Sequence, residues 1–252
     1  MTWFQHWTDV LFLHFAVRAN ELEPWMPPRV EVDTFDGKAW LSFVFFRLKV
    51  RPAGLPFIPV LSSLLELNVR TYVRHRGQAG IYFLRMYADN RLAIHAAQLL
   101  TPLSYEPATM IDRRRSDSQR HVECRPIGDR RGCLSADFSM ADRGGETCPG
   151  SFEFWLLERY RLFVGRRDGR ILAADVEHPR WRISAVETSE VKHDFDEALG
   201  LSLNPWPTAG HFSAGMAARF NTFRTVAEPR SASPFAVRCQ ARGRVPRGGI
   251  RT

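Results

Sequence analysis

Hydrophobic and polar residues alternate without interruption from residue 65 to residue 74, in the stretch LELNVRTYVR. The odd-numbered positions are mostly apolar: Leu65, Leu67, Val69, Thr71 and Val73. The even-numbered positions are more polar: Glu66, Asn68, Arg70, Tyr72 and Arg74. A period of two predicts a β-strand with one apolar face. The polar face then points either into solvent or into an enclosed polar cavity.

Further strand-like runs are separated by dipeptides that favour tight turns. Asp36-Gly37, Asp89-Asn90 and Asp168-Gly169 each stand between two such runs. The runs 38–47 and 79–87 are rich in the aromatic and aliphatic residues that strands favour. We therefore expect a β-hairpin at each of the three dipeptides.

Helical signals are few. Residues 19–26 predict a short helix that ends before two prolines, Ser151 is placed to cap a second helix, and residues 194–199 predict one more turn. Many strands with few helices predict a mainly β, antiparallel fold, either a barrel or a sandwich. We expect one domain over residues 1–227 and a disordered tail rich in Arg, Pro and Gly over residues 228–252.

The composition suits a protein with a substantial core, since 44% of the 252 residues are hydrophobic. No run approaches the roughly 18 apolar residues of a membrane span, and residues 1–21 lack the features of a signal peptide. The four cysteines form no C-x-x-C pair and have no histidine at zinc-finger spacing. We interpret them as reduced thiols and expect a cytoplasmic protein that does not contact a membrane.

The formal net charge of +8 is concentrated at one end of the chain. Residues 228–252 contain six arginines and one glutamate, so five of the eight net charges belong to the tail. Such a tail attracts nucleic acid or anionic surfaces, but aromatic residues for base stacking are not interleaved with its arginines. A solvated tail is the favoured interpretation, and nucleic acid is not predicted as a partner.

Most familiar catalytic signatures are absent. Neither the phosphate-binding G-x-x-x-x-G-K-[ST] nor the dinucleotide-binding G-x-G-x-x-G motif occurs. In HFSAG (211–215), His211 stands where a serine hydrolase needs glycine. His178, His193 and the carboxylates after them lack the ligand spacing of a metal site. We predict neither a metal nor another cofactor.

Lysine occurs at three positions, Lys38, Lys49 and Lys192. None lies in the apolar surroundings that lower the pKa of an amine enough for nucleophilic attack near neutral pH. A lysine-based mechanism is therefore not expected.

Several longer motifs resemble a known superfamily. The segment GIYFLRMYADNRLAIHAAQLLTPLSYEPA (80–108) resembles the acetoacetate-decarboxylase-like superfamily. ELNVRTYV (66–73), LERYRLF (157–163) and HPRW (178–181) resemble its YqjF-like branch of conserved bacterial proteins of unknown function. The resemblance runs from about residue 7 to residue 224 and excludes the tail. It implies a cone-shaped β-barrel with a closed polar pocket, and it implies a homo-oligomer.

The decarboxylases of that superfamily use a lysine that forms a Schiff base, a second lysine that lowers its pKa, and a glutamate in the same pocket. The glutamate position corresponds to Glu66. The lysine positions correspond to Tyr105 and Glu106, and the superfamily's G-R-E arginine corresponds to Gln98. The resemblance thus implies a retained pocket without the Schiff-base machinery.

The candidate site combines the strand with this resemblance. Glu66 and Arg70 lie about 13 Å apart along a strand, so they do not form a salt bridge within it. Burying both charges without partners in a dry interior would cost several kcal/mol of folding free energy. We predict a wet pocket in which Arg70 anchors a carboxylate, Glu66 is a general acid or base and Tyr105 donates to a developing oxyanion. The further substrate-binding candidates are Asn68, Tyr72, Glu106 and Gln98.

Three functions remain open at this stage. The first is lyase- or isomerase-type proton transfer on a small organic (oxo-)acid, and the second is binding of such an acid without turnover. In the third, Glu66 and Arg70 each pair with another side chain, stabilise the barrel interior and bind no ligand. A separate alternative is an interaction protein that uses the arginine-rich tail. We interpret His178 and Trp181 as structural.

Overall fold

Fourteen strands form one sheet in the computed structural model, which describes residues 2–58, 62–128, 130–141 and 144–226. The predicted tail lies outside these ranges. The strands are β1 (Thr2–Val17), β2 (Glu31–Val32), β3 (Ala39–Pro52), β4 (Ser63–His75), β5 (Gln78–Ala88), β6 (Glu106–Arg114), β7 (Gln119–Pro126), β8 (Leu134–Met140), β9 (Gly145–Glu146), β10 (Arg161–Gly165), β11 (Ile171–Glu177), β12 (Arg182–His193), β13 (Ala209–Asn221) and β14 (Arg224–Thr225).

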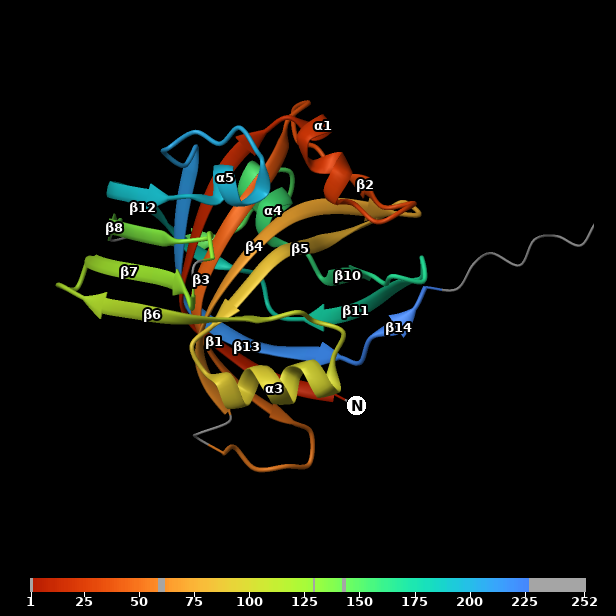
Figure 1. Cartoon of the computed structure of the whole chain (residues 1–252). Helices are drawn as coiled ribbons and strands as arrows, with labels where there is room; N and C mark the ends of the chain where they lie inside the picture. Colours follow the sequence, from red (N-terminus) through yellow and green to blue (C-terminus); the bar gives the residue numbers. More distant parts are fainter. Residues whose placement is uncertain (1, 59–61, 129, 142–143, 227–252) are drawn as a thin grey trace, which may run out of the picture.

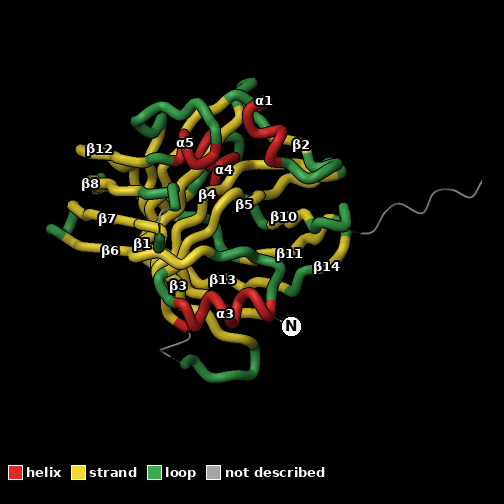
Figure 2. Tube along the Cα trace, in the orientation of Figure 1, coloured by secondary structure: helices red, strands yellow, loops and turns green. Residues whose placement is uncertain are grey.

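Strand pairing closes the sheet into two circuits that share one wall (Figures 1 and 2). The shared wall runs β13-β1-β3-β4-β5. On one side β10 and β11 connect β5 back to β13, and on the other side β6, β7, β8 and β12 make that connection. Pairing is antiparallel except where β5 meets β6 and β10. The predicted mainly β fold is confirmed, although the sheet is not one even barrel.

Both faces of the shared wall are buried. On β4, Leu65, Leu67 and Val69 belong to a first core that includes side chains of β7, β8 and β12. The opposite face of β4 contributes Leu64 and Tyr72 to a second core, together with side chains of β10 and β11. The strand predicted to have one apolar face therefore lies between two packed interiors, because strands far away in the sequence cover each side.

A β-bulge in β1 keeps the second face of the wall continuous. The register with β3 shifts between Thr8 and Leu11, and Asp9 has a φ of 55°. Arg47 and Arg120 form ion pairs with the Asp9 carboxylate. Opposite the bulge, a Cβ on Gly215 would stand 1.9 Å from the Trp7 carbonyl oxygen, so glycine is required there. The bulge adds one residue, so odd-numbered residues before it and even-numbered residues after it share a face.

The hairpin expected at Asp89-Asn90 is wrong. Strand β5 ends at Ala88, and α3 (Arg91–Leu100) begins with Asn90 as its N-cap, whose Oδ1 accepts a hydrogen bond from Ala93 N at 3.1 Å. The dipeptide that favours a turn also supplies an excellent helix cap. Helix α3 lies across the end of the shared wall (Figure 1).

The hairpin at Asp168-Gly169 is confirmed, since it joins the antiparallel strands β10 and β11. At Asp36-Gly37 a tight turn closed by the Phe35–Lys38 bridge is present, but β2 pairs with β4 and not with β3. The predicted helices correspond to α1 (Ala19–Leu22) with the 3-10 helix η1 (Glu23–Trp25), α4 (Phe152–Leu157) capped by Ser151, and α5 (Phe195–Leu199). In the described part of the chain, no helix has the length and apolar character needed to cross a membrane.

Candidate functional site

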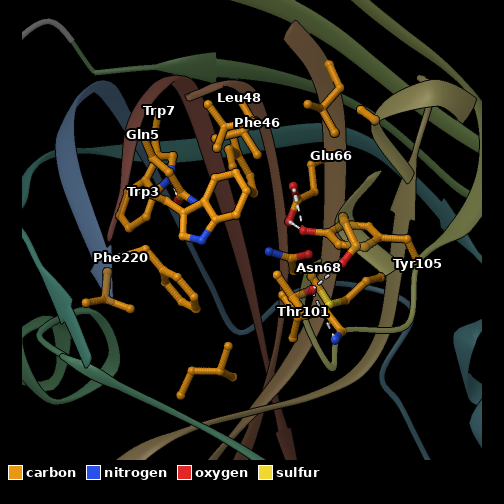
Figure 3. Close-up of a pocket in the computed structure, with 18 of the residues that line it drawn as sticks. Trp3, Gln5, Trp7, Phe46, Leu48, Glu66, Asn68, Thr101, Tyr105 and Phe220 are labelled. Carbon is orange, nitrogen blue, oxygen red and sulfur yellow. Dashed lines mark hydrogen bonds between the residues drawn. The ribbon is translucent and has the colours of Figure 1, made fainter. Parts of the chain in front are cut away.

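A cavity of about 350 Å³ lies on the second-core side of the shared wall. Its walls come from β1, β3, β4, β5, β10, β11 and β13, and Figure 3 shows side chains of several of these strands around it. Helix α3 contributes Ala93, Ile94 and Ala97 to the lining. Because of the bulge, Trp3 and Trp7 line the cavity together with Phe12. The cavity is thus a product of the closed strand circuit and the helix at its end.

Most of the lining is apolar, whereas the sequence predicted a polar pocket. The aromatic and aliphatic side chains of β1, β3 and α3 account for the difference. On the neighbouring strand β3, Phe46 and Val44 stand directly beside Glu66 and Asn68 in the pairing register. The polar lining residues are a minority: Gln5, Ser62, Glu66, Asn68, Arg70, Thr101, Tyr105, Arg159 and His178.

Glu66 and Tyr105 face each other at the α3 side of the cavity (Figure 3). The Tyr105 hydroxyl lies 3.4 Å from both carboxylate oxygens of Glu66, which is long for a hydrogen bond between oxygens. Burial raises the pKa of Glu66 to about 8, against smaller lowering effects from Asn68 and Tyr105. Burial, with the neighbouring Glu66, raises the pKa of Tyr105 well above its ordinary value. At pH 7 the Glu66 carboxyl is therefore mostly protonated and neutral.

Arg70 lines the cavity two strand positions beyond Asn68. Its Nε and Nη2 atoms are buried and have no hydrogen-bond partner among the described residues, and no carboxylate within those ranges forms an ion pair with it. The guanidinium instead stands 5.5 Å from the Phe12 ring centroid and 5.8 Å from that of Tyr72. Asn68 Oδ1 is likewise buried and accepts no hydrogen bond from the described part of the chain.

The polar side chains of the cavity form two sets, one around Arg70 and one around Glu66 and Tyr105. The charge of Arg70 lowers the pKa of His14 and of His178, in each case in addition to a larger effect of burial. The pKa of Glu66 is set by burial, Asn68 and Tyr105 instead. We therefore distinguish an Arg70 end and a Glu66–Tyr105 end, with Asn68 between them on β4.

Sequence reasoning missed part of the Arg70 end. Arg159 lines the cavity, pairs with Asp33 at 2.7 Å, and has a buried Nη2 without a partner among the residues described. His178 and Trp181 also line the cavity, although each has a structural contact: His178 Nδ1 is 2.8 Å from the Pro179 carbonyl oxygen, and Trp181 N donates to Glu158 Oε1. The LERYRLF and HPRW motifs were the available signal, since both meet ELNVRTYV at this one cavity.

The structure brings four of the seven predicted site residues to the cavity: Glu66, Asn68, Arg70 and Tyr105. Three others lie outside its lining. Tyr72 is fully buried and its hydroxyl is 2.7 Å from Ser42 Oγ, Glu106 pairs with Arg85 and Arg130, and Gln98 donates to the Tyr105 carbonyl oxygen.

Other candidate chemistries find no support at the cavity. None of the three lysines, all within the described ranges, lines it. Ser213 of the HFSAG stretch is buried, and its Oγ accepts a hydrogen bond from Gly215 N, which suits a strand-stabilising serine. Among the residues described, no three His, Cys, Asp or Glu side chains gather as metal ligands would.

Comparison with known proteins gives consistent matches. A family model described as "Uncharacterized conserved protein" (DUF2071) matches residues 4–217. YqjF of Bacillus subtilis (strain 168), described as uncharacterized, is 34% identical over 200 residues, which cover 79% of this chain and 82% of that protein.

Two solved structures have a similar fold. The enduracididine biosynthesis enzyme MppR, complexed with pyruvate, gives a TM-score of 0.65 at 12% identity, covering 90% of this chain and 91% of MppR. An acetoacetate decarboxylase-like enzyme from Sphingomonas wittichii RW1 gives a TM-score of 0.61 at 12% identity, covering 89% and 92% of the two chains. At such low identity the similarity shows a common fold, and it does not establish a shared chemistry. The family model and YqjF both match most of the chain, and the chain therefore belongs to this YqjF-type family of uncharacterized conserved proteins.

Proposed function

We propose that the cavity binds an organic acid, with Arg70 as the anchor for its carboxylate. The supporting observation is the guanidinium of Arg70, which has no carboxylate partner and whose buried Nε and Nη2 atoms have no acceptors among the described residues, although the side chain as a whole is only partly buried. Buried donors without a hydrogen-bond partner are unfavourable. A bound carboxylate would supply both the opposite charge and the missing acceptors.

The charges around the cavity favour a single anionic group. Arg159 pairs with Asp33, a carboxylate that also pairs with the half-exposed Arg74. Glu66 is mostly protonated at pH 7 because its pKa is about 8. Arg70 therefore remains as an uncompensated positive charge of the lining. The pyruvate complex of MppR, a protein of similar fold, agrees with an organic acid as ligand.

Calorimetric titration with pyruvate, acetoacetate and levulinate tests this proposal, since these acids carry an oxo group two, three or four carbons along the chain. Arg70→Met should weaken the binding of any acid that binds wild type by at least about 30-fold, because it removes the charge partner of the carboxylate. Arg219→Met is the matched control, since Arg219 is half-exposed on β13 and outside the cavity. Equal affinities of wild type and Arg70→Met would contradict the proposal.

A second function is favoured by the Glu66–Tyr105 pair, namely proton transfer without a Schiff base on a bound acid whose oxo group lies far enough from the carboxylate to reach this pair, since Glu66 stands about 13 Å along the strand from Arg70. In its ionised form Glu66 would remove a proton from the carbon next to the oxo group, and the Tyr105 hydroxyl would donate a hydrogen bond to the enolate oxygen that forms. The proton then resides on Glu66 and returns to carbon in the reverse step. A pKa of about 8 places Glu66 near the working range of a general base at neutral pH.

Exchange of the ligand's C–H protons for deuterium in D2O, followed by NMR, measures this step directly. Exchange by wild type should increase with pH up to about 8 and then level off, as Glu66 ionises. Glu66→Gln should slow exchange by roughly 100-fold or more and leave the affinity of the acid nearly unchanged. Binding without any catalysed exchange would assign the cavity to binding alone.

A further inference from the structure

The shape and lining of the cavity indicate more about the acid than its carboxylate. Along β4 the lining residues are Leu64, Glu66, Asn68 and Arg70, which span roughly 20 Å of strand at 3.3 Å per residue. The cavity is therefore elongated along the wall. A two- or three-carbon acid held at Arg70 would leave most of it unfilled.

The part of the cavity away from Arg70 is apolar on several sides. Trp3 and Leu48 lie on the β1–β3 side, and Phe220 comes from β13 (Figure 3). Ala97 and Leu100 of α3 also belong to this part of the lining. Apolar surfaces of this kind gain free energy when hydrocarbon replaces water against them. Polar groups of a ligand would find few partners there.

We take the apolar, partly exposed end of the lining as the entrance to the cavity. Leu55, Ile58 and Leu100 line the cavity, yet each remains about half exposed, at 54%, 47% and 56% of its surface. These residues follow the end of β3 and form the last turn of α3, so they lie at the Leu64 end of β4 rather than the Arg70 end. A ligand that enters here passes apolar side chains before it reaches Glu66, Asn68 and finally Arg70.

We propose that the natural ligand is an elongated amphipathic acid, with its carboxylate at Arg70 and a hydrocarbon body that extends past Glu66–Tyr105 toward α3. This inference rests on the proposed function, because it takes Arg70 as the carboxylate anchor. It adds the class of acid, which is a medium-chain or aryl-alkyl carboxylate rather than a two- to four-carbon acid. A functional group several carbons from the carboxylate would then lie beside Glu66 and Tyr105.

A chain-length series on the full-length protein tests this inference. Calorimetric titration with straight-chain carboxylates from acetate to dodecanoate should show the affinity rising about three- to fourfold per methylene until the cavity is filled. Ala97→Phe, which narrows the cavity from α3, should lower the affinity for decanoate and leave that for butyrate nearly unchanged. Leu99→Phe is the matched control on the same helix, because Leu99 is 86% exposed and outside the lining.

The outcomes separate this inference from the proposed function. Affinity that rises with chain length in wild type and falls in Arg70→Met supports both. If short acids bind in a way that depends on Arg70, but affinity does not rise with chain length, the amphipathic ligand is overturned. The role of Arg70 as carboxylate anchor then still stands. A gain with chain length that Arg70→Met leaves unchanged overturns the anchor. Should Ala97→Phe fail to fold, Leu100→Phe at the half-exposed entrance serves in its place.

Discussion

The two faces of β4 show how one strand serves two different interiors. On the first-core face, Leu65, Leu67 and Val69 are buried among side chains of β7, β8 and β12. On the cavity face, Glu66 and Asn68 are just as inaccessible to solvent, at 2% and 6% exposure. The side chains of the first face pack against other apolar side chains. The second face lines a cavity, and some of its polar atoms have no hydrogen-bond partner among the described residues.

This difference indicates that the polar face of β4 is not optimised for stability. Burial of a carboxyl group and of unpartnered guanidinium nitrogens is unfavourable, while the opposite face makes the ordinary contacts of a core. The contrast suits a site in which unfavourable groups are held for a ligand. It predicts that substitutions on the two faces will differ in their effect on the free energy of unfolding.

The largest expected effect is a change in how stability depends on pH. The unfolded chain releases the Glu66 proton near pH 4.5, but the folded protein keeps it until about pH 8. The free energy of unfolding of wild type should therefore fall between pH 4.5 and pH 8, by on the order of 4 kcal/mol from this group. Glu66→Gln should remove this loss and be more stable than wild type at pH 9, as measured by urea denaturation.

The control for that comparison is Glu187→Gln, since Glu187 is exposed on β12. Its unfolding free energy should follow that of wild type at every pH. Parallel pH curves for wild type and Glu66→Gln would show that Glu66 is not held protonated by the fold.

A smaller effect distinguishes the two faces by packing. Leu67→Ala removes a fully buried side chain from the first core and should lower the free energy of unfolding by about 3 kcal/mol. Leu64→Ala should cost about half as much, because Leu64 already faces the cavity and has fewer contacts to lose. Equal losses in denaturant unfolding would mean that the cavity face is packed as densely as the core.

The smallest effect concerns the helix that covers the cavity. Asn90→Ala removes the N-cap of α3 and should lower the free energy of unfolding by about 1 kcal/mol. Asn90→Asp retains the capping oxygen but loses the amide donor to the Ser63 carbonyl oxygen, so it should restore only part of this loss, as thermal unfolding can show. Asn90→Ala should also weaken ligand binding, because α3 supplies one wall of the cavity. Unchanged affinity would show that α3 does not contribute to the binding site.

The alternation in LELNVRTYVR was sufficient to predict β4 and to place Glu66, Asn68 and Arg70 on one face. It did not show that the other side of the wall is also covered, because the covering strands lie more than 80 residues later in some cases. The placement of Trp3 and Trp7 in the cavity depends on the bulge at Asp9, which reverses the parity of β1. Nothing in the local sequence marks that bulge.

The α3 side of the cavity was the main error of the sequence reasoning. The residues RLAI after Asp89-Asn90 were interpreted as the start of a strand, although Asn90 also fits a helix cap and α3 extends from Arg91 to Leu100. The polar character expected of the cavity was also too strong, since α3 and β1 contribute mostly apolar side chains. The polar half of the site was visible in the sequence because it lies on one strand, and the apolar half was not, because it is assembled from separate elements.

The most direct test of the account is a crystal structure of the protein with octanoate bound. We expect the carboxylate oxygens of octanoate to lie within about 3 Å of the Arg70 guanidinium nitrogens. The alkyl chain should pass Glu66 and Tyr105 toward α3. A carboxylate at the entrance beside Leu55 and Leu100, with Arg70 still without an anionic partner, would contradict it.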